Sequence, residues 1–222
     1  MSSTGSAGES ATGWCAREIE QELPGLRLLV GEARNARALD GDSPPEVIAR
    51  LRELSNRFRG ARAVGIRREP VPGAYRVFFR QIGLDPDVVR TPIEAAVMER
   101  MLRGGFHPRC LLEDVLLIAL LDTGVPVWAL DGASVDGHLG IRASEEGEPL
   151  GRAQNAPVLP AGRLVVADAT AALATLFGES ASAHAPHART SHLTLFVVQV
   201  AGVPTLYAEE SLWSARTALE QL

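Results

Sequence analysis

Three side chains in this sequence have the chemistry of an acid–base catalyst: two carboxylates and one imidazole. Glu94 stands three residues after Thr91 at the start of a predicted helix, so it can complete a capping box or hold an amino group in a pocket. Asp114 lies in an otherwise apolar segment, where it must be paired, favour a helix start or take part in chemistry, because burying an unpaired charge is costly. His192 begins a predicted strand, and an imidazole there can accept a proton near neutral pH.

A pair of arginines and a tryptophan are candidates for binding a substrate. Arg76 and Arg80 lie about one helical turn apart, so they share a helix face. They can hold a carboxylate or phosphate by paired hydrogen bonds, or they can form ion pairs with the acids of residues 85–94. Trp128 lies on a predicted strand, where it can form the floor of a pocket by stacking or pack in the core.

The segment 180–192 contains three histidines and three serines. Their spacing matches no zinc-ligand pattern, and no nearby cysteine completes one. No strained elbow or third member marks a serine–histidine nucleophile. We therefore assign no metal site, no cofactor and no catalytic triad.

Charge is unevenly distributed along the chain. Residues 50–109 hold 13 Arg and 6 acids, a local net charge of +7, whereas the rest of the chain has a net charge of −12. This basic segment can present a positive face to phosphate. Alternatively, its arginines can pair with local acids on a solvated helical surface. Arg62, Arg67 and Arg68 are the best candidates for RNA contacts, because they cluster beside a predicted helix and have few acids nearby.

Composition excludes several classes of protein. All 22 basic residues are arginine, so neither a Schiff-base lysine nor a P-loop lysine is present. The chain has 222 residues, 46% of them hydrophobic and 22% charged, which is typical of a single globular domain. No run of about 18 apolar residues predicts a membrane span, and the first residues do not resemble a secretory signal, so we expect a cytoplasmic protein without a membrane partner. Two cysteines are too few for a disulfide framework or a four-cysteine zinc site.

The elements that would position these residues can be located from caps and periodicity. We expect a disordered tail at residues 1–15, followed by one domain over 16–222. Helices are predicted over 44–59, 74–82, 92–103, 111–121, 169–177 and 209–222. Strands are predicted over 26–30, 125–130, 138–142, 164–167 and 193–200. Helices first and mixed strands later indicate an α+β fold.

The order of these pieces resembles the B3/B4 module of the bacterial phenylalanyl-tRNA synthetase β-subunit and its free-standing relatives. The motifs that carry the resemblance are YRVFFRQIGLDP, RTPIEAAVMERML, LLEDVLLIALLDTGVPVWALD and LVVADATAAL. They extend from about Tyr75 to the end of the chain, with a looser fit before it. The resemblance implies a single domain of β-layers, sandwich-like with mixed sheets, flanked by helices and enclosing a pocket between its two halves.

In the synthetase, that pocket hydrolyses tyrosine wrongly attached to the phenylalanine tRNA. The resemblance places Trp128 where the family has a histidine, and Thr175 within a wall that is rich in glycine in the family. It places Phe196 near a glutamate that reads the tyrosine hydroxyl. Asparagines of the editing pattern fall at Cys110, Leu111 and Leu117. These replacements indicate a less polar pocket of different shape.

Three functions follow as hypotheses. The first is an aminoacyl-tRNA or RNA-binding module. Its catalytic form would be a hydrolytic trans-editor, in which water and the tRNA's own hydroxyl replace a side-chain nucleophile. The second is an enzyme that uses the pocket for a free aromatic amino acid or amine, in a condensation or cyclisation such as a Pictet–Spengler-type reaction. The third is a non-catalytic amino-acid-binding protein. Because function resides in sites rather than in folds, the resemblance does not choose among them.

Overall fold

The computed structural model describes residues 10–34, 36 and 39–221. Residues 1–9 of the predicted tail lie outside the described residues. The helices are α1 Arg17–Glu22, α2 Pro45–Arg57, α3 Gly60–Gly65, α4 Pro70–Gln81, α5 Pro92–Arg103, α6 Leu111–Thr123 and α7 Thr205–Gln221. The strands are β1 Ala11–Thr12, β2 Trp14–Cys15, β3 Arg27–Arg34, β4 Val127–Asp131, β5 Gly140–Ala143, β6 Leu164–Ala167, β7 Ala172–Thr175 and β8 His192–Gln199. Short 3₁₀ turns lie at Ile66–Arg68 (η1), Gly132–Ser134 (η2) and Ser182–His184 (η3).

Two four-stranded sheets form the β part of the fold. The first has the order β1-β3-β8-β4, and all its pairings are antiparallel. The second has the order β2-β5-β6-β7, in which β2 runs parallel to β5 while the other pairings are antiparallel. One strand of each sheet therefore comes from residues 11–15, which form two short strands instead of the expected tail.

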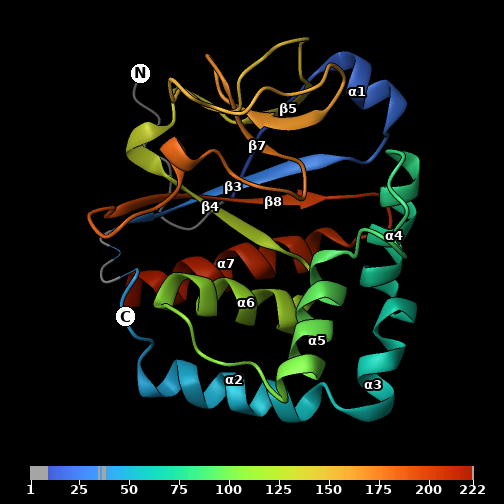
Figure 1. The fold of residues 1–222 in the computed structure, drawn as a ribbon, viewed down its shortest axis with the longest axis vertical. Coiled ribbons are helices and arrows are strands. Elements are labelled where there is room, and N and C mark those ends of the chain that lie inside the picture. The colour runs from blue at the N-terminus through green and yellow to red at the C-terminus, as the bar shows by residue number, and fades with distance from the viewer. Residues whose placement is uncertain (1–9, 35, 37–38, 222) are drawn as a thin grey trace.

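Helices cover one side of the first sheet, and the second sheet covers the other (Figure 1). α7 packs against β3 and β8, and α6 packs against α7. α2 lies further from the sheets, on the far side of α6, whereas α5 and α3 lie beside one end of α6, at the edge that also holds α4 (Figure 1). Two sheets, one antiparallel and one mixed, flanked by helices confirm the predicted α+β class.

Apolar packing explains why these elements assemble in this order. Seven of the eight residues of β8 are buried, because this strand is central in its sheet and is covered on both faces. α6 is apolar almost all round and fills the space between the sheet-facing helix α7 and the outer helices. A second core cluster joins α2, α3, α5 and α6 through Leu51, Phe58 and Ile93, among others. No described helix combines the length and the apolarity that crossing a bilayer requires.

One predicted element is wrong. Residues 169–177 were expected to form an alanine-rich helix, whereas Ala172–Thr175 form β7, which pairs antiparallel with β6. Alanine favours helix only weakly, and here the unpaired edge of β6 and the burial of Ala172, Leu173 and Ala174 decide the conformation. The sequence also gave no sign of α1 or α3, which have only six residues each.

Candidate functional site

Glu94 and Arg76 form an ion pair at the junction of α4 and α5. Arg76 Nη1 donates to Glu94 Oε1 at 2.7 Å, and Arg76 Nη2 donates to Asp87 Oδ1 at 2.6 Å. The other oxygen of Glu94 accepts from the Thr91 hydroxyl at 2.7 Å and from the Thr91 N–H at 3.3 Å, which completes a capping box. The side chains of Arg76 and Glu94 are only 11% and 9% exposed. Every oxygen of Glu94 is therefore engaged in contacts that hold α4 and α5 together.

Arg80 is exposed on α4 and has no carboxylate within 4.0 Å among the described residues. The hydrogen bond from Arg76 lowers the pKa of Asp87, and the charges of Arg80 and Arg67 add to this effect. Arg80 and Arg67 thus lie close enough to the same carboxylate to act on it, although only Arg76 contacts it. The two arginines of α4 consequently have different roles, one in an internal ion pair and the other free at the surface.

Asp114 lies in the first turn of α6 and is 1% exposed. Its carboxylate accepts a hydrogen bond from the Ser43 hydroxyl at 2.6 Å and from the Arg109 N–H at 3.1 Å. Negative charge at a helix start is also favoured by the helix dipole. These contacts fasten the segment before α2 to the start of α6.

His192 begins β8, opposite Arg34 of β3. Its Nε2 atom lies 3.5 Å from Glu32 Oε2, and its ring packs against Gly132. No hydrogen bond joins any two of Glu94, Asp114 and His192, which lie on α5, α6 and β8. The structure gives each of these three catalytic candidates its own set of neighbours.

The aromatic residues named as pocket candidates meet in one cluster. The rings of Trp128 and Phe196 stack with centroids 5.6 Å apart and planes 11° apart. Phe177 lies 5.3 to 5.6 Å from the rings of Trp128 and of three aromatic residues of α4, Tyr75, Phe78 and Phe79. Thr175 contacts the carbonyl of Glu179 through its hydroxyl.

Phe177 adopts φ 58, the left-handed region that favours glycine. It lies in the segment where the resemblance implies a glycine-rich wall. Because its ring contacts the aromatic rings of α4 and of Trp128, it lies between α4 and strand β4, where we expected a pocket.

A hollow of about 450 Å³ opens beside Leu176, between the end of α4 and strands β5 and β6. Another, of about 300 Å³, opens between α3 and α5. Its lining contains the apolar residues Val64, Met98 and Met101 and the charged residues Arg67, Arg76, Asp87, Arg90 and Glu94. Neither Arg67 nor Arg90 has a carboxylate within 4.0 Å among residues 10–34, 36 and 39–221.

The three predicted RNA-binding arginines have different surroundings. Arg62 lies 3.8 Å from Glu69 and its guanidinium covers the ring of Phe58 at 5.2 Å. Arg67 and Arg68 lie in η1 between α3 and α4, are exposed, and have no ion pair with any described residue. We define the arginine surface as Arg67, Arg68, Arg80 and Arg90.

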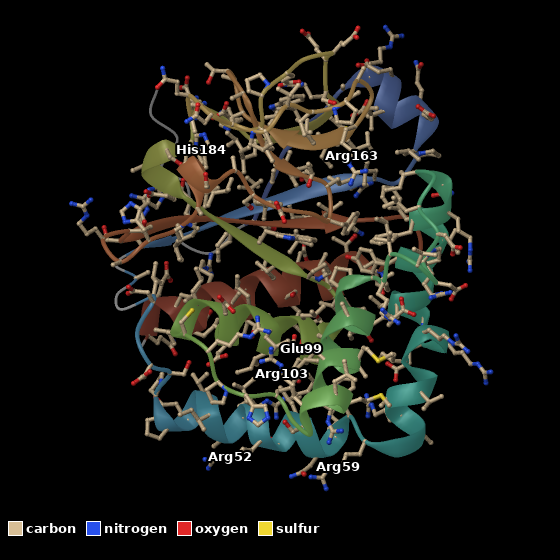
Figure 2. The ribbon with its side chains drawn as sticks, in the orientation of Figure 1. Arg52, Arg59, Glu99, Arg103, Arg163 and His184 are labelled. Atoms are coloured by element: carbon tan, nitrogen blue, oxygen red, sulfur yellow. The ribbon has the colours of Figure 1, made fainter. Side chains whose placement is uncertain are left out.

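A buried polar cluster escaped the sequence analysis. Arg152 Nη2 donates to Asp168 Oδ2 at 2.5 Å, and Arg152 Nη1 donates to the carbonyl of Ser134 at 2.8 Å. His184, which is 2% exposed, lies 3.0 Å from the Ser134 hydroxyl through Nδ1 and 3.5 Å from Arg152 (Figure 2). Burial lowers the pKa of His184, and the charge of Arg152 lowers it further, so the imidazole is neutral at pH 7.

This cluster joins four loops rather than forming a nucleophile site. The cation Arg152, and not a carboxylate, lies beside His184, so the third member of a serine–histidine triad is absent from the described contacts. The contacting pairs are 16 to 50 residues apart in sequence, so no local spacing predicts that Arg152, Asp168, Ser134 and His184 meet.

Part of the chain is similar to phenylalanine–tRNA ligase beta subunits. The subunit of Xanthomonas axonopodis pv. citri is 38% identical over 68 residues, which are 31% of this chain and 8% of that protein. The subunit of Xanthomonas oryzae pv. oryzae is 37% identical over 99 residues, or 43% of this chain and 12% of that protein. No protein-family model matches the chain. The resemblance to this subunit is thus confirmed, while its assignment to the B3/B4 module stays a prediction because the match covers only a small part of the relatives.

Proposed function

We propose that this protein binds tRNA through the arginine surface. The observation that carries the proposal is that Arg67, Arg68, Arg80 and Arg90 are exposed and unpaired among the described residues, while the neighbouring carboxylates Asp87 and Glu94 are already occupied by Arg76. Guanidinium groups without a direct ion pair can contact phosphate at once, whereas ion-paired ones would first have to break a contact. The partial similarity to a tRNA ligase subunit supports RNA as the source of that phosphate.

Hydrolysis of a misacylated tRNA is the finer form of this proposal. Tyrosine editing of the synthetase type needs an open amino-acid pocket, and the Phe177 ring packs against the aromatic rings of α4 and Trp128 in the segment where the resemblance implies the pocket wall. The carboxylates of Glu94 and Asp114 already accept hydrogen bonds from within the protein, which disfavours both as bases that activate water. We therefore propose binding without tyrosine-specific hydrolysis, and we expect tyrosine-charged phenylalanine tRNA to decay at its uncatalysed rate.

The test measures tRNA affinity by filter binding at 50 and 200 mM salt. Each phosphate contact contributes roughly −0.7 to −0.9 to the slope of log affinity against log salt, so about three contacts predict a roughly 20- to 40-fold loss over this range. An Arg67→Ala, Arg68→Ala double variant should bind several-fold more weakly and should lower the slope by about two.

The matched control is an Arg52→Ala, Arg59→Ala double variant, which removes the same charge. Both control arginines are exposed, have no ion pair with the described residues, and lie along α2 and its end, away from η1 and α4 (Figure 2). This control should bind tRNA much like the parent. Absent or salt-independent tRNA binding by the parent would contradict the proposal and favour the small-molecule hypotheses. Equal losses of affinity in the two double variants would contradict the assignment of binding to the arginine surface.

A further inference from the structure

The outer face of α7 carries large apolar side chains beside its charged residues. Its inner face, Ala208, Leu212, Ala215 and Leu219, is buried against β3, β8 and α6. On the outer side, Leu206 is 69% exposed and Trp213 is 57% exposed. Large exposed apolar side chains that gather on one face mark interaction surfaces, and tryptophan is among the residues that contribute most to them.

A hollow of about 790 Å³ borders this face where α7 crosses β3. It forms beside Gly31, whose position lacks a side chain, and a Cβ there would lie 3.2 Å from the Leu212 side chain. The lining also contains Trp213, Glu209, Glu210 and Arg216. The hollow thus combines an apolar wall with two acidic groups and one basic group.

Neither Glu209 nor Arg216 has an ion-pair partner within the described part of the chain. Glu209 is exposed and has no cation within 4.0 Å. Arg216 Nε is buried and has no hydrogen-bond partner. A buried N–H without an acceptor is unfavourable, and a partner's carboxylate at the guanidinium would supply the counter-charge that the described residues do not.

The positions of these groups along α7 make the face self-complementary. Glu209 and Arg216 are seven residues apart, about two turns, so they lie on the same side of the helix. A two-fold axis that passes through the midpoint of a helix relates two antiparallel copies of that helix. A residue of one copy then lies opposite the residue of the other copy that is equally far from the midpoint on its other side. With the axis beside Trp213, Glu209 of each copy faces Arg216 of the other, and the two tryptophans lie side by side at the centre.

We propose that two copies of this chain form a dimer through the outer faces of their α7 helices, antiparallel across a two-fold axis. We expect a second copy of the chain to cover the hollow, because Glu209 and Arg216 of one α7 match Arg216 and Glu209 of the other. Trp213 supplies the apolar centre and the two Glu209–Arg216 pairs fix the register. This surface is separate from the arginine surface, so a dimer leaves tRNA binding open.

The test is a charge exchange measured by sedimentation velocity over a dilution series, in reducing buffer. The parent should sediment as a species of twice the 23.7 kDa chain mass. Glu209→Arg alone and Arg216→Glu alone should each raise the dimer dissociation constant at least 10-fold, because each places like charges opposite one another. The double variant Glu209→Arg, Arg216→Glu should restore dimerisation to near the parent value.

Two further variants make the result specific. Trp213→Ala should also weaken the dimer, whereas Glu146→Arg, an equal charge change on an exposed loop of the second sheet, should not. Circular dichroism shows whether each variant is folded. A parent that is monomeric at every concentration overturns the proposal, and so does a dimer that neither charge reversal weakens or that the double variant fails to restore.

Discussion

Asp168 should make this protein sensitive to acid. Its side chain is fully buried and accepts hydrogen bonds from Arg152 and from the backbone N–H groups of Asp136, Thr170 and Ala171. Burial raises the pKa of the carboxyl, but these donors outweigh burial and lower the pKa from 3.8 to about 2.

The size of the effect follows from this pKa. One pKa unit corresponds to about 1.4 kcal/mol, so the ionised carboxylate stabilises the folded protein by about 2 kcal/mol at neutral pH. Because the pKa is lower in the folded state than in the unfolded state, this stabilisation is fully present above about pH 4. It is lost as the pH falls from about 4 towards 2.

Asp168→Asn removes the charge and leaves an amide group facing some of the same donors. We expect the free energy of unfolding to fall by about 3 kcal/mol at pH 7, of which about 1 kcal/mol comes from the mismatched donors. The difference between parent and variant should shrink as the pH falls below about 4, because the parent then loses its charge as well.

Urea unfolding followed by tryptophan fluorescence at a series of pH values measures both quantities. Asp136→Asn is the control, because that side chain is exposed and only the Asp136 backbone contacts Asp168. A difference between parent and Asp168→Asn that stays constant from pH 7 to pH 3 would refute the linkage argument.

Five further substitutions, at four positions, test the packing. Tyr75→Phe removes the hydroxyl that donates at 2.9 Å to a carbonyl of β8, and should cost about 1 kcal/mol in urea unfolding. Phe177→Gly and Phe177→Ala should both destabilise the fold by about 2 to 4 kcal/mol. The glycine variant should be the more stable of the two by about 1 kcal/mol, because residue 177 has φ 58, and the opposite order would contradict backbone strain at this residue. Gly140→Ala should displace the Trp14 ring, which covers this glycine, and alter the near-ultraviolet dichroism. Glu94→Gln should cost about 1 to 2 kcal/mol by weakening both the capping box and the Arg76 pair, and equal stability to the parent would show that neither contact matters.

The positions of most helices and strands could be predicted because their signals are local. Thr91, Pro92 and Glu94 mark the start of α5, and Gly104 ends it with φ 80. α6 was expected to be buried because it is apolar on most sides, and seven of its 13 residues are buried. Such caps and periodicities depend on residues within one or two turns of each other, so a sequence displays them directly.

The failures occurred where distant residues decide. β7 replaced an expected helix because β6 offers it a pairing edge, and the strands of residues 11–15 exist only because β3 and β5 lie beside them. A two-residue strand has no periodicity of its own that a sequence could reveal.

The sequence alone determined that a basic segment and a carboxylate in an apolar helix, Asp114, were present. Only the tertiary structure decided which contacts form: Arg76 with Glu94, Asp114 with Ser43, which is 71 residues away, and Phe177 with the rings of α4. Composition and spacing fix the charge and the local conformation of a side chain. Whether that charge is free to bind a ligand depends on which partner folding brings within hydrogen-bonding distance, because ion pairing and burial act through space and not along the chain.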